Sequence, residues 1–458
     1  LHLKMKIFNS LTGKKETFKP KIKREVSIYI CGLTPYDDVH IGHARTFINF
    51  DVIVKFLRFI GFKVKYVRNI TDVDDKIINR AKEEGIPALD FSKKFIKEMH
   101  KDFLSLGIDS PDVEPKVSEH IEEIISMIQS LEEKGYAYRK NKSDVYFDIQ
   151  KFKNYGKLAN RTLDQLSAAE RTITDLNKKH EADFVLWKMD TDGITWPSPW
   201  GKGRPGWHIE CSAMSIKYLG EEFDIHGGGL DLKFPHHENE IAQAKCATER
   251  NFASLWMHTG PLRIEDKKMS KSLKNFITVK DILKDFHPEV LRLFFLLTHY
   301  RSPISYSKEG LENAKRVLDK FYTLFSDIKT PRKFNEDKTF REEFISAFQD
   351  DFNSPKALSL LQAYAGNTES SGDLSTDKLC TLKVLLNSLG LLLEDVEKYF
   401  KYGELGLSDR EIEKLISDRN DARGNKKFDL ADEIRDQLLK KGIVLEDLDG
   451  KTIWKKKS

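Results

Sequence analysis

Hydrophobic positions near the start of the chain change from the spacing of a strand to that of a helix and back. Residues 26–30 form a β-branched run typical of a buried strand, and a loop with glycine and proline follows it. Apolar residues recur with a period near 3.6 over residues 47–60, before a second strand-like run at 63–70. This order predicts a βαβ unit. Ligands of such parallel sheets bind at the carboxyl ends of the strands, here residues 31–43 and 71–75.

The pattern changes again after residue 115. A helical period over residues 121–131 precedes strand-like runs at 136–138 and 145–149, which we interpret as an insertion. Toward the C-terminus, Ser408 and Glu411 form a capping-box pattern, and two further helical and hairpin patterns follow. We predict an α/β fold made of a Rossmann-like parallel-sheet domain at residues 1–115 and 207–310, an insertion at 116–206, an α-helical bundle at 311–400 and a small α+β C-terminal domain at 401–458.

Composition restricts the class of protein. Of the 458 residues, 40% are hydrophobic and 32% are charged, which excludes wholesale disorder and a membrane protein. Lys and Arg total 76 and Asp and Glu total 72, and the resulting charge of +4 excludes only a histone-like polycation. The basic N-terminus lacks the apolar segment of a signal peptide, and the apolar stretch at 290–297 is far shorter than a membrane span. We expect a cytoplasmic protein with no membrane partner.

Two short strings contain residues suited to nucleotide chemistry. In His40-Ile-Gly42-His43, two imidazoles lie at the predicted start of a helix, where free N–H groups suit phosphates and the glycine admits a flat base. In Lys268-Met-Ser-Lys271-Ser, ammonium groups on an aperiodic segment can follow the charge of a transferring phosphoryl group. Surface histidines and a solvated basic loop are the commoner explanations of each string alone. Chance would rarely place both around a βαβ unit.

Four cysteines are present, Cys31, Cys211, Cys246 and Cys380. They form no close pair, which excludes a disulfide framework and a compact zinc knuckle. His236 and Glu240 are four residues apart just after Pro235, so a helix would direct both side chains from one face. This spacing suits two ligands of one metal ion. An ordinary contact on a helix surface would also explain His236 and Glu240, and the cysteines would also be explained as small buried hydrophobic residues.

Several longer strings carry a family resemblance. They are Tyr29-Ile-Cys31-Gly-Leu-Thr34, Asn69-Ile-Thr71-Asp-Val-Asp74-Asp75-Lys76, Arg204-Pro-Gly-Trp207-His208-Ile-Glu-Cys211, Asp224-Ile-His226-Gly-Gly-Gly229 and Phe234-Pro-His236-His237-Glu-Asn-Glu240. Together with the two nucleotide strings, they resemble the cysteinyl-tRNA synthetase family of class I aminoacyl-tRNA synthetases. The similarity runs from Lys6 to Trp454. One departure is Lys274, where the family usually has glycine.

The resemblance implies an ATP-dependent ligase that forms cysteinyl-adenylate and transfers cysteine to the 3′ end of tRNA(Cys). His40, Gly42 and His43 are then expected to bind ATP, which is accompanied by Mg²⁺. Lys271, with Lys268, is expected to stabilise the transition state.

The resemblance also implies one Zn²⁺ per chain. Cys31, Cys211, His236 and Glu240 match the family's zinc ligands residue by residue. Zinc prefers a thiolate to a hydroxyl, so it is expected to distinguish cysteine from serine without an editing domain. The residues expected to bind the cysteine substrate are Cys31, Gly32, Thr71, Trp207, His226 and Asp231. His208, His226 and His237 also lie near the motifs, where a lone histidine is more often structural than catalytic.

The C-terminal segment does not reveal its partner by charge. Residues 401–458 contain 14 basic and 13 acidic residues, a net charge of 14 − 13 = +1. Lysines flank Trp454, which either stacks on an unpaired base or packs the small domain. The resemblance implies anticodon binding there. We expect a monomer.

Two other functions compete. A ligase that joins cysteine to an amino sugar would use the same ATP and zinc sites, but its relatives lack the C-terminal domain. A non-catalytic zinc-organised RNA-binding protein would leave the string at Lys268–Ser272 unexplained.

Overall fold

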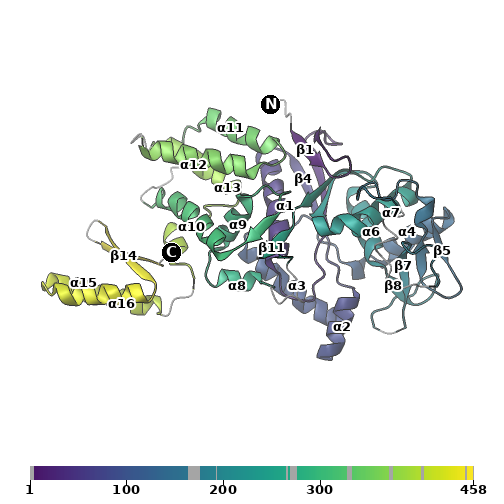
Figure 1. The fold of residues 1–458 in the computed structure, drawn as a ribbon, viewed down its shortest axis with the longest axis horizontal. Helices are drawn as coiled ribbons and strands as arrows, with labels where there is room; N and C mark the ends of the chain where they lie inside the picture. Colours follow the sequence, from purple (N-terminus) through teal and green to yellow (C-terminus); the bar gives the residue numbers. More distant parts are fainter. Residues whose placement is uncertain are drawn as a thin grey trace.

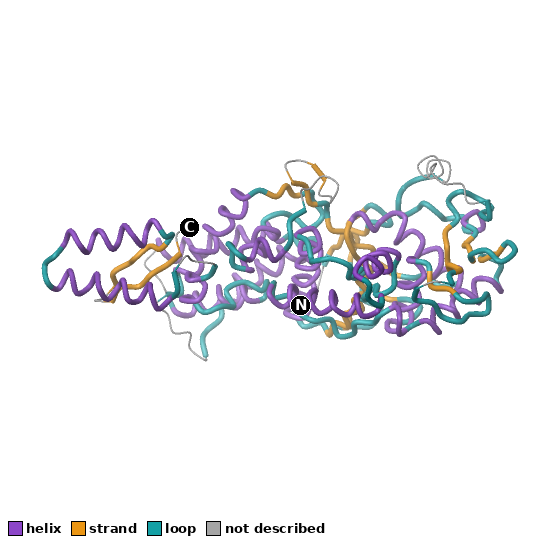
Figure 2. Tube along the Cα trace, turned by 90° about the horizontal axis from the view of Figure 1, so that it is seen from below, coloured by secondary structure: helices purple, strands orange, loops and turns teal. Residues whose placement is uncertain are grey.

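The computed structural model describes residues 5–162, 176–191, 193–264, 267–268, 276–326, 333–370, 375–403, 407–448 and 451–456. The chain forms an elongated molecule with the parallel sheet near its middle (Figure 1). The predicted insertion lies at one end, and the C-terminal helices α15 (Asp409–Gly424) and α16 (Phe428–Lys440) lie at the other (Figure 2). The ligand site predicted at the carboxyl ends of the parallel strands therefore lies near the middle of the molecule.

Four parallel strands form the central sheet in the order β10-β9-β3-β4. They are β3 (Glu25–Ile30), β4 (Lys63–Arg68), β9 (Phe223–Gly229) and β10 (Ala253–Thr259). Both faces of the sheet are covered, because most of the residues in β3, β9 and β10 are buried. Ile28 pairs with Ile225 on one side and Tyr66 on the other, so segments far apart in the sequence share the core.

Helix α1 (Ile41–Phe59) connects β3 to β4 and confirms the predicted βαβ unit. A side chain at Gly227 of β9 would meet the ring of Phe50 at 2.4 Å, so this glycine permits close packing of α1 on the sheet. Helix α9 (Pro288–Leu296) packs on α1, and its buried Arg292 forms an ion pair of 2.7 Å with Asp51.

An antiparallel hairpin and a small sheet flank the central sheet. Strands β1 (Lys6–Asn9) and β2 (Lys14–Thr17) form the hairpin, which docks on β10. The second sheet has the order β12-β11-β13. The remaining elements of this region are α2 (Asp75–Glu84), α3 (Ala88–Ser105), β11 (Leu262–Ile264), β12 (Lys267–Lys268), α8 (Val279–Leu283) and β13 (Ile304–Tyr306).

The insertion forms an antiparallel sheet with the order β5-β6-β7-β8, and β5 and β6 confirm the two short strands predicted there. Its strands are β5 (Ala137–Arg139), β6 (Val145–Phe147), β7 (Phe184–Met189) and β8 (Gly203–Pro205). Helices α4 (Ile121–Glu133), α6 (Trp207–Leu219) and α7 (Glu238–Thr248) pack together beside it. Short helical turns occupy Val117–Glu119, Ile149–Lys151, Leu230–Leu232 and Lys233–His237.

In the described part of residues 308–401, five helices follow the sheet domain and confirm the helical periodicity of that region. They are α10 (Lys308–Thr323), α11 (Lys338–Gln349), α12 (Ser354–Ser370), α13 (Thr376–Asn387) and α14 (Val396–Lys401). Their apolar faces join the core of α1 and the sheet, so this part is not an independent lobe.

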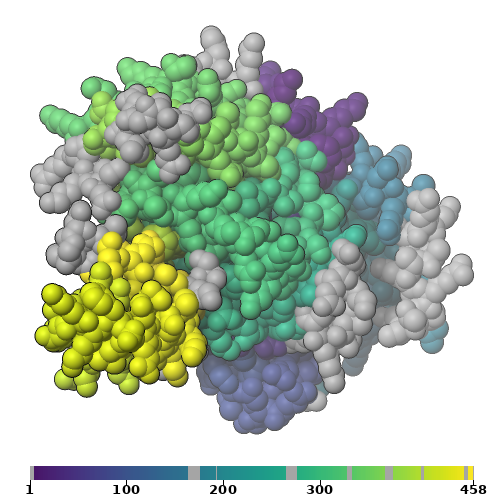
Figure 3. All heavy atoms as spheres, turned by 60° about the vertical axis from the view of Figure 1, so that its left-hand side comes forward, coloured from purple at the N-terminus to yellow at the C-terminus, as the bar shows by residue number. Residues whose placement is uncertain are grey.

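The C-terminal residues form a separate lobe, drawn in yellow in Figure 3. Its elements are α15 (Asp409–Gly424), α16 (Phe428–Lys440), β14 (Ile443–Leu448) and β15 (Lys451–Lys456). The capping box of Ser408 with Glu411 and the hairpin are both present, as predicted. Trp454 is buried in a small core with Ile412 and Leu438. Among the described residues, no helix is long and apolar enough to cross a bilayer.

Candidate active site

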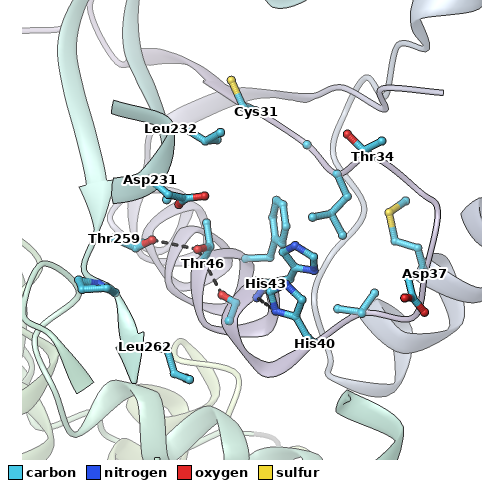
Figure 4. Close-up of a pocket in the computed structure, with 18 of the residues that line it drawn as sticks. Cys31, Thr34, Asp37, His40, His43, Thr46, Asp231, Leu232, Thr259 and Leu262 are labelled. Atoms are coloured by element: carbon cyan, nitrogen blue, oxygen red, sulfur yellow. Dashed lines mark hydrogen bonds between the residues drawn. The ribbon is translucent and has the colours of Figure 1, made fainter. Parts of the chain in front are cut away.

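A cavity of about 630 Å³ opens at the carboxyl ends of β3, β9 and β10. This is where parallel sheets bind ligands, and the sequence predicted it. Figure 4 shows His40 and His43 on one side of the cavity, Asp231 and Thr259 on the side of the strands, and Cys31 at the top. The cavity therefore joins the start of α1 to the end of β3.

The two histidines of the first nucleotide string form the beginning of α1. His40 is the N-cap, and its Nδ1 accepts a hydrogen bond of 3.1 Å from the backbone N–H of His43. The two rings stack with centroids 3.4 Å apart. Gly42 also lines the cavity, beside the first turn of the helix. Backbone N–H groups and the helix dipole make this position favourable for phosphate.

The second nucleotide string lies mostly outside the described residues. Lys268 ends the short strand β12 opposite Arg263, whereas Lys271 and Lys274 lie outside the described part of the chain. The segment that follows is anchored against the histidine string. The N–H of Ile41 donates to the carbonyl of Ile277, and the N–H of Val279 donates to that of Val39.

Cys31, Cys211, His236 and Glu240 meet in one buried cluster, although the two cysteines are 180 residues apart. The ligand atoms all lie within 4.8 Å of one another. The Cys31 Sγ lies 3.7 Å from Cys211 Sγ and 3.4 Å from Glu240 Oε1, and His236 Nε2 lies 3.1 Å from the same Oε1. Tetrahedral zinc with bonds of 2.0–2.3 Å separates its ligands by about 3.3–3.8 Å. The donor set and its spacing fit a zinc ion.

The protonation of the cluster also favours a cation. Burial and the neighbouring Cys211 raise the pKa of the Cys31 thiol well above its usual range. Burial acts to raise the pKa of Cys211 too, but hydrogen bonds with Cys31 and His236 lower it to about 6. Burial opposes ionisation of Glu240, yet the charges of His226 and His236 hold its pKa well below its usual range. Burial acts to lower the pKa of His236, but Glu240 and Cys211 raise it to about 10. A thiolate and a carboxylate thus face the His236 proton, which a divalent cation bound there would replace.

Three other histidines contact the residues of the cluster. His208 Nδ1 lies 2.9 Å from His236 Nδ1. Burial lowers the pKa of His208 well below its usual range, so its ring is neutral and accepts a hydrogen bond from the N–H of His236. His226 Nε2 lies 2.8 Å from Glu240 Oε2. His237 Nε2 lies 3.4 Å from the Cys31 sulfur. The sequence places these histidines near the motifs but gives no signal for their partners.

The residues predicted to bind the cysteine substrate fall into two groups. Cys31, Gly32, Trp207 and Asp231 line the cavity. A side chain at position 32 would meet the Asn69 carbonyl oxygen at 1.6 Å, so only glycine fits there. The other two residues, Thr71 and His226, are buried and are not among those that line the cavity.

Two family models match the chain. The class I tRNA synthetase (C) catalytic domain matches residues 17–316, and the cysteinyl-tRNA ligase anticodon binding domain matches residues 407–454. The curated cysteine–tRNA ligase of Methylococcus capsulatus is 48% identical over 463 residues, covering 99% of this chain and 100% of the relative. That of Francisella tularensis subsp. novicida is 47% identical over 460 residues, covering 99% and 100%.

Solved structures show the same fold at low identity. Methionyl-tRNA synthetase of Mycobacterium tuberculosis with methionyl-adenylate has a TM-score of 0.58 at 14% identity, covering 80% of this chain and 89% of that one. A leucyl-tRNA synthetase of Agrobacterium radiobacter in a ternary complex with tRNA has a TM-score of 0.58 at 11% identity, covering 81% and 84%. The predicted α/β fold is confirmed. By its two matching models and its full-length relatives, the chain belongs to the cysteine–tRNA ligases of the class I aminoacyl-tRNA synthetase family.

Proposed function

We propose that the cavity beside Cys31 activates cysteine with ATP and transfers it to tRNA(Cys). The observation that carries this proposal is that Cys31 both lines the cavity and belongs to the buried cluster. A nucleotide bound at the start of α1 and an amino acid whose sulfur faces the cluster would therefore meet in one space.

In the first step, a carboxylate oxygen of cysteine bonds to the α-phosphorus of ATP, and pyrophosphate leaves with the bridging oxygen. His40 and His43 hold the phosphates at the positive end of α1, and Gly42 leaves room for the base. Lys271 and Lys268 stabilise the charge that builds on the phosphates, and Mg²⁺ accompanies ATP as part of the substrate. In the second step, a ribose hydroxyl of the tRNA attacks the activated carbonyl, and AMP leaves.

We propose that Cys31, Cys211, His236 and Glu240 hold one zinc ion per chain. When bound, zinc supplies a cation that prefers the thiolate of cysteine to the hydroxyl of serine. A hydrophobic pocket alone distinguishes a hydroxyl analogue by only about 100-fold, so selection by the metal would remove the need for an editing site. His208 keeps the donor atom of His236 aimed into the cluster.

The cysteine substrate lies between the cluster and the nucleotide. Asp231 lines the cavity and offers a carboxylate to the substrate ammonium group. Trp207 stacks on His236 with centroids 4.5 Å apart and closes the same side. Gly32 lets the substrate approach the backbone. For Thr71 and His226, substrate binding stays a prediction, and His226 is well placed to orient Glu240.

The tRNA partner is proposed to span the long axis of the molecule. The acceptor end would enter the cavity, and the anticodon would reach the C-terminal lobe at 401–458, whose match to an anticodon-binding model supports this. The division into sheet domain (1–115 and 207–310), insertion (116–206) and bundle (311–400) remains part of the proposal. We also propose that the enzyme acts as a monomer in the cytoplasm, to be tested by light scattering and cell fractionation.

Cysteine-dependent exchange of pyrophosphate into ATP tests the first step, and charging of purified tRNA(Cys) tests the second. We expect both activities with cysteine, neither with serine, and loss of both after zinc chelation. Activation without tRNA charging, but with transfer to an amino sugar, would favour the alternative ligase. Binding of RNA without pyrophosphate exchange would show a non-catalytic protein.

A further inference from the structure

A chain of three hydrogen bonds runs from the candidate metal cluster to the N-terminal hairpin. His237 Nε2 lies 3.4 Å from the Cys31 sulfur, His237 Nδ1 lies 2.8 Å from His258 Nε2, and His258 Nδ1 lies 2.8 Å from the Ser10 hydroxyl. Cys31, His237 and His258 are all buried. These three groups are therefore shielded from water, whereas Ser10 at the far end is only partly buried.

The far end of this chain is fixed by backbone contacts. Ser10 follows strand β1, and its N–H donates to the carbonyl of Trp256 at 2.9 Å. Asn9 donates to the carbonyl of Ser254 and accepts from the N–H of Trp256. These bonds hold the hairpin on β10, the strand that carries His258. They fix the backbone from which the serine hydroxyl reaches His258.

The direction of the three bonds follows from their last acceptor. A metal-bound cysteine is a thiolate, which can only accept, so His237 donates from Nε2. A neutral imidazole has one N–H, so His237 Nδ1 accepts from His258 Nε2, and His258 Nδ1 accepts from Ser10. Burial favours neutral rings here, and it lowers the pKa of His258 to about 3. Each group thus determines the tautomer of the next.

We propose that Ser10, acting through His258 and His237, is a positioning residue that maintains a hydrogen bond to the Cys31 thiolate and so adjusts the affinity of the metal centre for the substrate sulfur. This inference rests on the proposed zinc site. A hydrogen bond to a ligating thiolate withdraws electron density from the sulfur, and the metal then accepts a further thiolate more readily. The serine lies outside the active-site cavity yet determines how selectively the site binds cysteine.

The same atoms allow one competing arrangement. Cys31, His226 and His237 also offer ligand atoms within 4.8 Å of one another. If His237 bound a second metal ion through Nε2, its hydrogen bond to Cys31 would be lost, and the two bonds to His258 and Ser10 would run in the opposite direction. A zinc content of two per chain, falling to one in His237→Ala, would overturn the proposal. One zinc per chain in both proteins is expected.

The full-length enzyme is tested as Ser10→Ala, which removes the last donor, and as Ser10→Thr, which restores it. In Ser10→Ala we expect zinc affinity, measured by chelator competition, to fall about tenfold, within the range for outer partners of metal ligands. We also expect the thiolate-to-metal absorption band of the cobalt-substituted protein to shift, and the KM for cysteine to rise about fivefold while the KM for ATP stays constant. Ser10→Thr should return all three values toward wild type.

A control is Ser92→Ala on α3, which removes a buried serine hydroxyl that donates to the Leu89 carbonyl. It should change none of the three values. An unshifted cobalt band with unchanged zinc affinity in Ser10→Ala, in a wild-type enzyme that binds zinc and activates cysteine, would refute the relay alone. A wild-type chain that binds no zinc would refute the proposed metal site itself.

Discussion

Single side chains at the site behave differently from the same residues in water because they are buried together. Cys211 ionises readily because Cys31 and His236 form hydrogen bonds to it, while burial keeps the Cys31 thiol protonated before a metal binds. The sequence predicts these ligands, since the residue strings around them are specific. It does not predict the contacts of His208 or His258, because those depend on where separate elements meet.

Replacement of a ligand tests the metal assignment. Cys211→Ser should lower zinc affinity by more than about 100-fold and raise the KM for cysteine in parallel, because the cluster loses a thiolate. Metal analysis and pyrophosphate exchange measure the two effects. Cys246→Ser is the control, since Cys246 is buried outside the cluster and burial raises its pKa to about 12. Unchanged zinc stoichiometry in Cys211→Ser would contradict the assignment.

The lysine of the second string should act on the transition state. We expect Lys271→Ala to slow adenylate formation by at least about 100-fold, while the dissociation constant for cysteine changes less than about threefold. Rapid-quench kinetics and equilibrium binding separate the two quantities. Equal losses in both would indicate that Lys271 binds the ground state instead.

Asp102 of α3 should make stability depend on pH. Burial, and also the charge of Asp38, raises the pKa of Asp102 to about 6 against the opposing charge of Lys280. A raised carboxyl pKa stabilises the fold below the unfolded value near 4, and this contribution is lost as the pH rises through about 6. Asp102→Asn should therefore be more stable than wild type by about 1 kcal/mol at pH 8 and no more stable at pH 4, once partial solvent screening is allowed for.

Thermal unfolding at the two pH values measures this difference. Asp418→Asn, on the exposed face of α15, is the control for the Asp-to-Asn change itself in the middle of a helix. A stability difference that is the same at both pH values would show that Asp102 is not the titrating group.

At the scale of elements, ion pairs and backbone contacts join the segment after the second string to the loop before α1. Lys280 on α8 contacts Asp38 at 2.7 Å and Glu98 of α3 at 3.0 Å. Thr278 caps α8 and pairs with His40 in an isolated bridge. The described segment that starts at Phe276 is thus joined to the first string by backbone hydrogen bonds and by one lysine.

Removal of that lysine should loosen the connection. Lys280→Ala is expected to reduce the rate of adenylate formation about tenfold and to leave the KM for cysteine within about twofold. The loop before α1, which carries Asp38, is then less often in its productive position. Lys284→Ala on the same short segment removes a surface pair with Asp281 and serves as the control. A rise in the KM for cysteine alone would contradict this role.

Hydrophobic spacing predicts the buried elements better than the exposed ones. β3 and α1 follow their apolar patterns closely. Strand β2 (Lys14–Thr17) has almost no apolar residues, so no periodicity reveals it, and it forms because β1 offers a partner edge. The hydrogen bonds of that hairpin to β10 depend on the complete fold, which explains why the role of Ser10 could not be predicted.

At the scale of the whole molecule, the C-terminal lobe has a core of its own and few contacts with the rest. Lys401 lies over the Trp454 ring at 4.6 Å and Lys455 lies over Phe400 at 4.6 Å, both near the junction. The buried tryptophan stabilises the lobe, which favours packing over base stacking for this residue. The surrounding lysines remain the candidates for tRNA contact.

Removal of residues 407–458 tests this division of labour. We expect pyrophosphate exchange with cysteine to remain within about threefold of the full chain, while tRNA(Cys) charging falls by at least about 100-fold, because anticodon contacts are lost. Retention of α14 in the shortened chain preserves the stacking of Tyr399 on Tyr322. Loss of both activities would show that the lobe supports the fold of the active site.

The distance along the chain between the metal ligands has a consequence for how the enzyme is made. The first ligand is Cys31 and the last is Glu240, so a growing polypeptide can complete the cluster only after more than half of its 458 residues have been joined. Helix α7 must also leave the ribosome and pack before its ligand reaches the first strand. The proposed zinc site is therefore completed only in the second half of biosynthesis, and nascent fragments that end before α7 should not compete for the metal through a complete site.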